Sequence, residues 1–239
     1  MLPVYQAFDR VQFAEVATDG AEDLEGKLAR ASEIFAARDG WLKPHQRVAV
    51  LQDLAKRLDV ERERFTRLIA REGGKPYTDA AIEVARAIDG VRDGADELRN
   101  FGGREIPMGL TTATEDRWAF TIREPIGVVA AISAFNHPLN LIVHQVAPAI
   151  ATGCPVIVKP ANTTPLCCLE FVKLVHAAGL PKPSARASCR RTTCSRSASR
   201  LTSGWHFSAS SARRGWAGPC AASCRPGRAA RSSTGARRL

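Results

Sequence analysis

The chain has 239 residues, of which 45% are hydrophobic, and a formal net charge of +10. This length suits one large domain or two small ones, and this much apolar side chain can form a sizeable core. No apolar run reaches the roughly 18 residues that indicate a transmembrane helix, and the opening MLPVYQAFDR lacks the basic and apolar regions of a secretory signal. We therefore expect a cytoplasmic protein with reduced thiols that does not contact a membrane.

The positive charge is concentrated at one end of the chain. Residues 184–239 contain twelve Arg, twelve Ser and no Lys, Asp or Glu, whereas residues 1–183 carry 22 Lys and Arg against 24 Asp and Glu. The body is therefore slightly acidic, and the basic isoelectric point is no argument that the body binds nucleic acid. The tail also lacks Val and Ile and shows no helical or strand period. Such a segment buries too little apolar surface to offset its conformational entropy, so we expect it to be disordered.

Residues 1–105 show the periodicity of amphipathic helices. In residues 22–40, apolar side chains recur at three- and four-residue steps, which places them on one face of a helix. Residues 45–74 and 78–101 repeat the pattern, and a Gly-Gly pair closes the first of these two segments, as expected at a helix end. Helix packing alone explains this zone, and the pattern predicts no chemistry.

Residues 106–183 change to a pattern of alternating strands and helices. The expected elements are a half-buried strand at 116–124, a fully buried strand at 127–133, a helix at 138–153, a second buried strand at 154–160 and a helix at 163–181. The order strand, helix, strand, helix predicts a right-handed βαβ unit in a parallel sheet. The expected fold class is therefore α/β, with N-terminal helices followed by part of a Rossmann-like parallel sheet and a disordered basic tail.

Two polar residues lie just beyond the carboxyl ends of the two buried strands, where parallel α/β sheets bind their ligands. Asn136 follows the first strand and Lys159 closes the second. An amide at this place can donate an N–H to the oxyanion that forms on a carbonyl substrate. A lysine can bind ribose hydroxyls or phosphate, helped by the weak positive field of the following helix N-terminus. Each residue also has an ordinary explanation, because Asn is common in turns and a lysine after a strand is often simply solvated.

The stretch around these residues resembles the aldehyde dehydrogenase superfamily. The resemblance rests on the strand entry Glu-Pro-Ile-Gly, the turn Phe-Asn-His-Pro, the run Val-Ile-Val-Lys-Pro followed by Thr-Pro-Leu, and the upstream Glu-Gly-Gly-Lys-Pro. It extends over roughly residues 20–183, so it is not a local coincidence. By this resemblance, residues 1–183 are the N-terminal portion of a cofactor-binding domain, and residues 184–239 are a separate tail.

The resemblance also implies roles for particular residues. Asn136 would be the oxyanion-hole amide that binds the carbonyl oxygen of a small-molecule aldehyde, and Lys159 would contact the adenosine ribose or phosphate of NAD or NADP. The cofactor cleft would be lined by Ile132, Ser133, Ala134 and Phe135. Asn162 stands where many members carry a Glu or Ser that meets the ribose, so the choice between NAD and NADP stays open. Intact members of the family are usually homo-oligomers.

The superfamily oxidises an aldehyde to a carboxylic acid through a cysteine thiohemiacetal, with a glutamate that activates water. Both catalytic residues lie well beyond position 183 in typical members, so we expect this chain to be truncated and inactive. Its own cysteines do not fill the gap. Cys154, Cys167 and Cys168 sit among apolar residues, as inert packing thiols do. The four tail cysteines lack the paired spacing of a zinc site, and we expect no metal site.

A shifted reading frame would also explain the tail. Suppose that the Ser codons of Trp205–Gly218 are TCN and the Arg codons CGN. The frame that starts at the third base of the Trp205 codon then permits Ala-Phe-Phe-Ser-Phe-Ile-Gly-Ser-Ala-Arg-Val-Gly. An apolar strand followed by Gly-Ser-x-x-x-Gly resembles the cofactor-binding turn of this superfamily. The simultaneous loss of Val, Ile, Lys, Asp and Glu after Pro183 agrees with the same hypothesis.

Two other functions stay open. A basic tail can bind nucleic acid or an acidic partner. Its aromatic residues are only Trp205, Phe207 and Trp216, and it shows no recognisable fold, so we do not expect nucleic acid as a partner. Alternatively, the chain is a non-catalytic interaction fragment that pairs with intact subunits through strand 116–124. We also expect the edge of strand 154–160 to lack its neighbours, and hence a poorly soluble or molten body.

Overall fold

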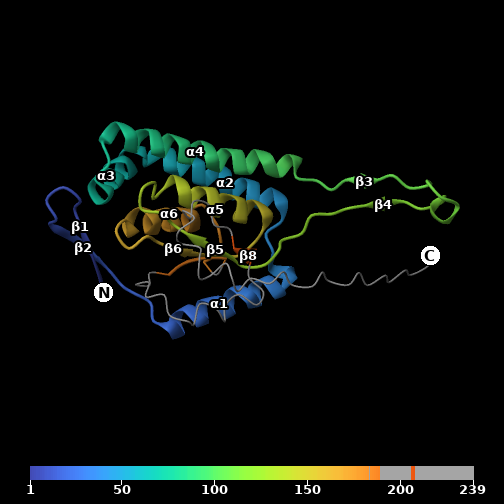
Figure 1. Cartoon of the computed structure of the whole chain (residues 1–239), viewed down its shortest axis with the longest axis horizontal. Helices are drawn as coiled ribbons and strands as arrows, with labels where there is room; N and C mark the ends of the chain where they lie inside the picture. The colour runs from blue at the N-terminus through green and yellow to red at the C-terminus, as the bar shows by residue number, and fades with distance from the viewer. Residues whose placement is uncertain (183, 189–205, 208–239) are drawn as a thin grey trace.

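The computed structural model describes residues 1–182, 184–188 and 206–207, and it consists of stacked layers with an arm at one end (Figure 1). A parallel sheet lies between helix α1 (Ala21–Ala36) on one side and helices α5 (Asn140–Thr152) and α6 (Pro165–Ala177) on the other. Helices α2 (Pro44–Val60), α3 (Arg62–Gly73) and α4 (Tyr77–Asn100) form an outer layer over α5 and α6. Two short 3-10 helices, η1 (Arg38–Gly40) and η2 (Thr112–Thr114), lie in the connections.

The sheet contains the βαβ unit that the sequence predicts. Strands β5 (Val129–Ile132) and β6 (Val156–Lys159) pair in parallel, and α5 connects them. Gly153 ends α5 in the left-handed conformation, with a φ of 84°. Two further parallel strands, β7 (Ala185–Ala187) and β8 (His206–Phe207), complete the order β7-β6-β5-β8. The expected α/β fold class is therefore confirmed.

Strand β7 corrects the expectation that the edge of β6 lacks a neighbour. Val156 N donates to Ser184 O at 2.9 Å, and Ser188 N donates to Val158 O at 2.7 Å. This pairing uses backbone groups alone, so it forms although Ala-Arg-Ala contains no residue with high β propensity. The sequence pattern therefore missed β7 and β8, which lie within the segment that we expected to be disordered. Residues 189–205 and 208–239 lie outside the described residues, and their disorder stays a prediction.

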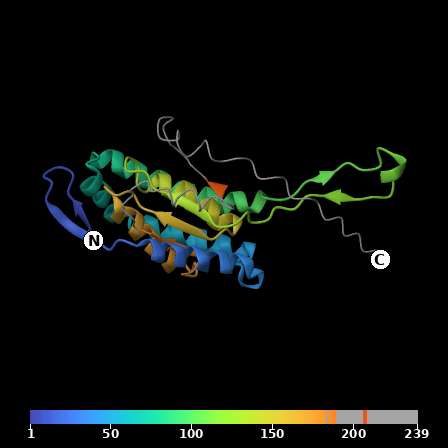
Figure 2. The same ribbon diagram turned by 60° about the horizontal axis from the view of Figure 1, so that its bottom comes forward.

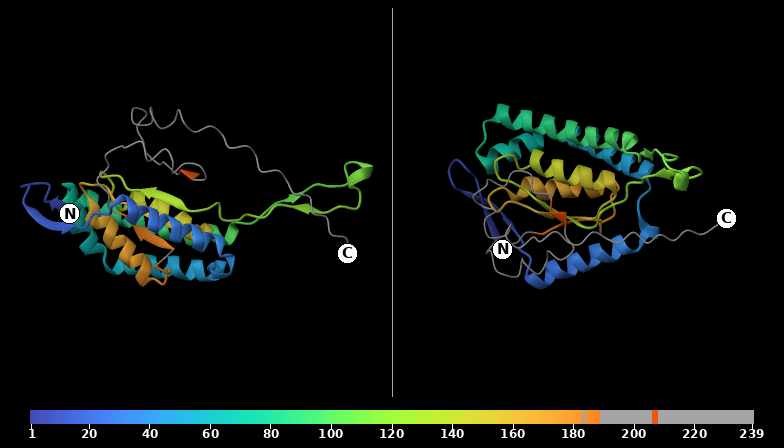
Figure 3. Two further views of the ribbon diagram at one scale, coloured as in Figure 1. Left: turned by 90° about the horizontal axis from the view of Figure 1, so that it is seen from below. Right: turned by 45° about the vertical axis from the view of Figure 1, so that its right-hand side comes forward.

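Both faces of the sheet are covered at β6, as its continuous apolar run predicts. The expectation of a fully buried strand at 127–133 is wrong for β5, in which Ala131 is buried but Val129 and Ala130 are half-buried and Ile132 is exposed. On one face Ile157 packs against Leu28 and Ala31 of α1, which buries the stripe that the periodicity of residues 22–40 indicated. Helix α1 runs along this face of the sheet (Figure 3). On the other face Val156 and Val158 join the main core together with residues of α5 and α6. Successive residues of β6 therefore point to opposite faces, and both faces find apolar partners.

The outer helices share one core with α5 and α6. Phe65 of α3, Leu54 of α2 and Val84 of α4 are fully buried in this core. The segment predicted as one helix at 45–74 is two helices, because the backbone at Glu61 leaves the regular helical conformation, with φ −94° and ψ 14°. After this break, α3 packs against both α4 and α6.

The first residues of the chain form a β-hairpin and not the helical segment that we expected within residues 1–105. Strands β1 (Leu2–Tyr5) and β2 (Gln12–Val16) pair antiparallel. Burial alternates along β1, and this period-two pattern was overlooked beside the stronger helical periods that follow it. The apolar side of the hairpin packs against Leu166 and Leu169 of α6, so a contact distant in sequence supports it.

An arm extends from the layered body (Figure 2). It contains β3 (Glu105–Ile106) and β4 (Ala119–Phe120), which pair antiparallel. We expected a half-buried strand at 116–124, but the ladder includes only β4, and Trp118 and Phe120 are 88% and 73% exposed. The expected burial of this strand is therefore wrong for the chain by itself. Alternation of apolar and polar residues does not specify which surface covers the apolar side.

Helices α4 and α5 approach closely at two glycines spaced one helical turn apart. A Cβ atom added to Gly90 would lie 3.5 Å from Val143 Cγ1, and one added to Gly94 would lie 3.5 Å from Ala147 Cβ. These are ordinary van der Waals distances, so a methyl group fits but a longer side chain would collide. The two glycines therefore set how near α4 lies to α5.

Gly94→Leu is expected to lower the free energy of unfolding by about 1–3 kcal/mol, the usual cost of overpacking a core. Gly26→Leu is the matched control, because Gly26 lies inside α1 with open space around it. This control should gain roughly 0.5–1 kcal/mol, since it removes a glycine from a helix interior. Urea unfolding followed by circular dichroism measures both variants. Equal stability of the two variants would contradict the close packing of α4 on α5.

Candidate active site

The predicted site residues meet at the carboxyl ends of β5 and β6. Ile132 and Lys159 are paired residues of the two strands, and Ser133 N donates to Lys159 O at 2.9 Å. The turn that contains Asn136 follows β5 at once and leads into α5. The parallel register thus brings together residues that the sequence assigns to two separate strands.

Asn136 lies on the exposed side of this turn. Its side chain is exposed, and among the described residues it has no hydrogen-bond partner. Ser133, in contrast, is buried, and its Oγ donates to Pro138 O at 3.2 Å, which holds the base of the turn. Ala134 is half-buried, whereas Ile132 and Phe135 are 43% and 65% exposed. The turn therefore presents one free amide and two apolar side chains to a ligand.

Lys159 and Asn162 form a second group at the same edge of the sheet. Lys159 Nζ donates to Pro160 O at 3.0 Å and to Asn162 Oδ1 at 3.3 Å. Lys159 is half-buried and Asn162 is exposed. A cation at the end of β6 and an amide in the connection after it thus lie together, a combination that can bind the hydroxyl groups of a ribose.

A buried carboxylate fixes the other side of the Asn136 turn. Glu83 of α4 is 1% exposed, and its Oε1 accepts hydrogen bonds from Leu139 N at 2.9 Å and from Asn140 N at 3.1 Å. These N–H groups lie at the start of α5 and have no partner within the helix, so Glu83 caps α5 from a different helix. Lys75 forms an ion pair with Oε2 of the same carboxylate, which offsets the cost of burying its charge.

Glu72 of α3 caps α6 in the same way. Its two oxygens accept from Leu166 N at 3.0 Å and from Cys167 N at 2.9 Å. We expected this helix N-terminus to add a positive field for a cofactor phosphate, and that expectation is wrong because Glu72 already occupies it. Burial raises the pKa of Glu72 to about 7, and the two backbone hydrogen bonds lower it by less.

The segment Glu-Gly-Gly-Lys-Pro did not by itself predict a role for Glu72, Lys75 or Glu83. A signal was present, since Glu83 lies between Ala80 and Val84 on the buried stripe of α4. A carboxylate on a buried stripe needs hydrogen-bond donors or a counter-charge, so it predicts a capped helix or an ion pair nearby. The helix that it caps could not be predicted, because the first N–H partner is 56 residues away in the sequence.

Gln145 of α5 supports the last residue of β5. Its Oε1 accepts from Ile132 N and its Nε2 donates to Ile132 O, both at 2.9 Å. The side-chain amide therefore takes the place of a neighbouring strand, because β8 pairs only with Val129 and Ala130. Sequence reasoning missed this buried glutamine, since its role exists only across the interface between sheet and helix.

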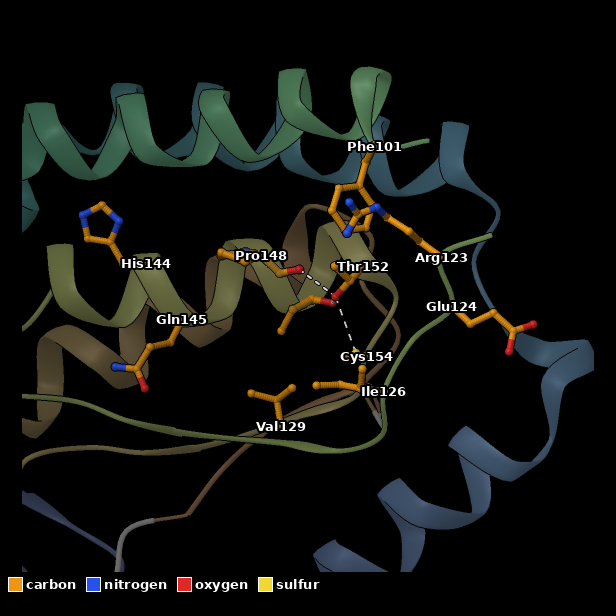
Figure 4. A pocket seen from close by; sticks show the side chains of 11 residues that line it. Phe101, Arg123, Glu124, Ile126, Val129, His144, Gln145, Pro148, Thr152 and Cys154 are labelled. Carbon is orange, nitrogen blue, oxygen red and sulfur yellow. Dashed lines mark hydrogen bonds between the residues drawn. The ribbon is translucent and has the colours of Figure 1, made fainter. Parts of the chain in front are cut away.

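A hollow of about 350 Å³ lies elsewhere, near the amino ends of β5 and β6 (Figure 4). Phe101 and Arg123 form part of its wall, and Thr152 Oγ1 donates to Pro148 O at 2.8 Å and to Cys154 Sγ at 3.5 Å (Figure 4). No predicted site residue lines this hollow. Parallel sheets bind ligands at the carboxyl ends of their strands, which lie at the opposite end from this hollow. The candidate active site is therefore the Asn136 turn and not this hollow.

The cysteines of the described residues are buried, as the sequence predicted. Cys154, Cys167 and Cys168 lie within the core and form no disulfide bond among the described residues. Burial, followed by the charge of Glu72, raises the pKa of Cys167 well above its ordinary value, so this thiol is not an activated nucleophile. In the described part of the chain, no group of three or more His, Cys, Asp or Glu side chains could hold a metal ion. No helix within that part is long and apolar enough to span a membrane.

Residues 1–186 match the sequence model of the Aldehyde dehydrogenase family. The chain belongs to the aldehyde dehydrogenase family. The match ends close to Pro183, where the composition of the chain changes. It confirms the family that the motifs around Asn136 and Lys159 indicated.

Curated aldehyde dehydrogenases align with most of the chain. The 3-sulfolactaldehyde dehydrogenase of Priestia megaterium is 35% identical over 181 residues, which cover 76% of this chain and 37% of that protein. The mitochondrial succinate-semialdehyde dehydrogenase of Arabidopsis thaliana is 35% identical over 170 residues, which cover 70% of this chain and 31% of that protein. The chain therefore spans about a third of the length of these relatives.

Solved aldehyde dehydrogenases share the fold of the described residues. Aldehyde dehydrogenase 21 of Physcomitrella patens, in complex with the reaction product succinate, matches with a TM-score of 0.77 at 31% identity. That match covers 84% of this chain and 41% of the other chain. The glyceraldehyde-3-phosphate dehydrogenase GapN of Methanocaldococcus jannaschii, complexed with NADP, matches with a TM-score of 0.74 at 28% identity, over 80% of this chain and 41% of the other.

The raised pKa of Glu72 predicts a pH dependence of stability in this aldehyde dehydrogenase chain. Between pH 4.5 and about 7 the folded chain keeps a proton on Glu72 that the unfolded chain releases. The contribution of Glu72 to the free energy of unfolding is therefore complete below this window and is lost as pH rises through it. The loss is about 3 kcal/mol, at roughly 1.4 kcal/mol per pKa unit.

Glu72→Gln is expected to remove this component, and urea unfolding at about pH 5 and about pH 8 measures it. Other carboxylates titrate in both chains, so the difference between variant and unaltered chain isolates Glu72. Glu97→Gln, at an exposed position of α4, is the control and should keep the pH dependence of the unaltered chain. The same pH dependence in Glu72→Gln and in the unaltered chain would mean that Glu72 does not hold its proton.

Proposed function

We propose that this chain forms the cofactor- and carbonyl-binding part of an NAD(P)-dependent aldehyde dehydrogenase, which oxidises an aldehyde to a carboxylic acid. One observation carries the proposal: Asn136 follows β5 and Lys159 is the last residue of the neighbouring strand β6, at the carboxyl ends of the strands, where such sheets bind ligands. Solved neighbours are complexed with NADP or with nicotinamide adenine dinucleotide, and the curated relatives named above are dehydrogenases of aldehydes. These similarities support the substrate class and the cofactor.

Asn136 is the proposed oxyanion donor. Its amide carries N–H groups without a charge, so it can bind a carbonyl oxygen as negative charge develops on it. Strand β5 ends before Asn136, and no described residue competes for this amide. Removing such a donor typically costs about 2.7–4 kcal/mol of transition-state stabilisation. Asn136 would therefore act on the chemical step and not on cofactor binding.

Lys159 and Asn162 are the proposed contacts to the adenosine ribose. The accessible Ile132 and Phe135 offer apolar surface to an adenine ring at the same end of the sheet, and Ser133 and Ala134 would lie on that side of the proposed cofactor site. The carboxylate at the N-terminus of α6 favours ribose hydroxyls over a phosphate at this place. The Lys159 ammonium could still meet a 2′-phosphate, so NAD and NADP both fit. When bound, the nicotinamide ring accepts the hydride of the aldehyde.

We further propose that the chain by itself binds cofactor without oxidising aldehydes. The reaction needs an accessible thiolate that attacks the aldehyde, and a carboxylate that activates water. Cys154, Cys167 and Cys168 are buried, so none of these thiols is accessible to an aldehyde beside Asn136. Formation of NADH or NADPH from an aldehyde and oxidised cofactor, catalysed by the purified chain, would overturn this part of the proposal.

Lys159→Ala is expected to weaken the binding of NADH or NADPH by about 10- to 100-fold, because a hydrogen bond to a charged group contributes about 1.5–3 kcal/mol. Titration followed by nicotinamide fluorescence gives the Kd. Lys56→Ala, at an exposed position of α2, is the control. Asn136→Ala should keep the Kd within about twofold of the unaltered chain. No binding by the unaltered chain, or an unchanged Kd in Lys159→Ala, would count against the proposed cofactor site.

For residues 184–239 the proposal is a shifted reading frame. It is supported by the end of the family match at residue 186, beside the loss of Val, Ile, Lys, Asp and Glu. DNA sequencing across codons 180–239, translated in three frames, tests it. Arg and Ser codons genuinely in frame would instead favour a tail that binds an acidic partner, whose affinity should fall steeply with salt. The proposed location is the cytoplasm, in agreement with core cysteines that form no disulfide bond among the described residues.

A second candidate function is self-association through the arm. Large apolar side chains are exposed along it, namely Ile106, Leu110, Trp118, Phe120 and Ile122. A two-stranded ladder with apolar side chains and free edges is a surface that monomers rarely leave uncovered. We propose a second copy of the chain as the partner, because most oligomers of soluble proteins are symmetric homo-oligomers.

Combined replacement of Trp118 and Phe120 by Lys is expected to convert an oligomer into a monomer. The reason is that two buried apolar anchors would become desolvated charges at the interface. Sedimentation equilibrium over a range of chain concentrations gives the mass of each species. Phe8→Lys is the control, because Phe8 is even more exposed but belongs to the β1–β2 hairpin connection. A monomeric mass for the unaltered chain at every concentration would exclude this function.

A further inference from the structure

Three side chains form a connected group beneath the Asn136 turn: Lys75, which lies between α3 and α4, Glu83 of α4, and His137 of the turn itself. Lys75 Nζ lies 2.9 Å from His137 Nδ1 and forms an ion pair with Glu83 Oε2. His137 Nδ1 lies 3.3 Å from the same carboxylate oxygen. The Glu83 side chain is fully buried, the Lys75 side chain is 15% exposed and the His137 side chain is 40% exposed.

The chemistry of the three groups decides where the imidazole proton lies. An ammonium carries only donors, so Nδ1 of His137 must accept a hydrogen bond from Lys75. An imidazole nitrogen that accepts carries no proton, which makes the ring neutral with its proton on Nε2. In the alternative tautomer, His137 Nδ1 carries the proton and donates to Glu83. This N–H would then face the N–H donors of Lys75, and the hydrogen bond to Glu83 would span 3.3 Å, which is longer than the 2.9 Å between Nδ1 and Lys75 Nζ.

The turn has few other attachments to the body. Phe135 and Asn136 are exposed, so their side chains do not hold it. Its inner side is fixed by the Ser133 hydroxyl, by the two backbone N–H groups that donate hydrogen bonds to Glu83, and by the ring of His137. Lys75 contacts both the Glu83 carboxylate and the His137 imidazole, so it links the two side chains that hold the turn.

We propose that Lys75 is a positioning residue: it holds His137 as the neutral Nε2–H tautomer and, together with Glu83, fixes the turn that carries Asn136. The consequence for carbonyl binding rests on the proposed function, whereas the tautomer and the geometry of the turn do not. Without Lys75, Glu83 becomes the nearest partner of Nδ1, and the proton moves to Nδ1 so that the imidazole can donate to the carboxylate.

Long-range proton–nitrogen NMR of the ¹⁵N-labelled chain tests this directly. Each of the five His residues gives a pattern in which protonated and unprotonated ring nitrogens differ, and His137→Gln identifies the signals of His137. The unaltered chain should show an unprotonated Nδ1 and a protonated Nε2 at neutral pH. In Lys75→Met the proton of His137 should lie on Nδ1 and not on Nε2, and the side-chain amide signals of Asn136 should shift. Lys56→Met, on the exposed face of α2, should change neither.

Lys75→Arg separates positioning from general stability. A guanidinium is also a donor without an acceptor, so the Nε2–H pattern and the Asn136 amide signals should persist. If Lys75→Met does not fold, the unaltered chain and Lys75→Arg decide. A protonated Nδ1 in the unaltered chain, or an Nδ1–H pattern in Lys75→Arg, would overturn the proposal. These readouts need neither cofactor nor aldehyde, so their failure is distinct from a failure of the proposed function.

Discussion

The arrangement of this chain depends on a carboxylate buried where two helices meet. Taking the charge of Glu83 out of water costs several kcal/mol unless partners replace the water. Two N–H groups at the start of α5 and the ammonium of Lys75 supply those partners. Because the same N–H groups would otherwise lack an acceptor, the carboxylate and the helix end satisfy each other. This interaction joins the outer helical layer to the turn that presents Asn136.

Glu72 repeats the arrangement at α6, and the repetition bears on how a cofactor can bind. In many parallel α/β sheets, the free N-terminus of a helix that follows a strand receives a phosphate. Here carboxylates occupy the N-termini of both α5 and α6. A dinucleotide at this edge would therefore meet side chains such as Lys159 and Asn162 and not an open helix end. The same two carboxylates tie α3 and α4 to the βαβ unit, so the packing of the layers and the shape of the site have a common cause.

Apolar side chains are closely packed in the core and exposed on the arm. Residues of α4 and α5 pack so closely that Gly90 and Gly94 take the place of larger side chains. The arm leaves Trp118 and Phe120 in solvent, although an exposed aromatic side chain forfeits a large hydrophobic gain. A chain that packs its core closely and exposes its arm has a surface suited to a partner, which is the physical basis for proposing self-association.

Most of the local elements and the family could be predicted from the amino-acid sequence. Helical periods located α1, α4 and the segment that forms α2 and α3, the apolar runs located β5 and β6, and the ends of those runs predicted Asn136 and Lys159 as site residues. These features depend on neighbours a few positions away, so they are legible in a single segment. The partners of Glu72 and Glu83, the pairing of β7 with β6, and the exposure of the arm became visible only in the folded structure. Each of these depends on groups distant in sequence, and a buried charge or a backbone N–H does not specify in advance which distant group will satisfy it.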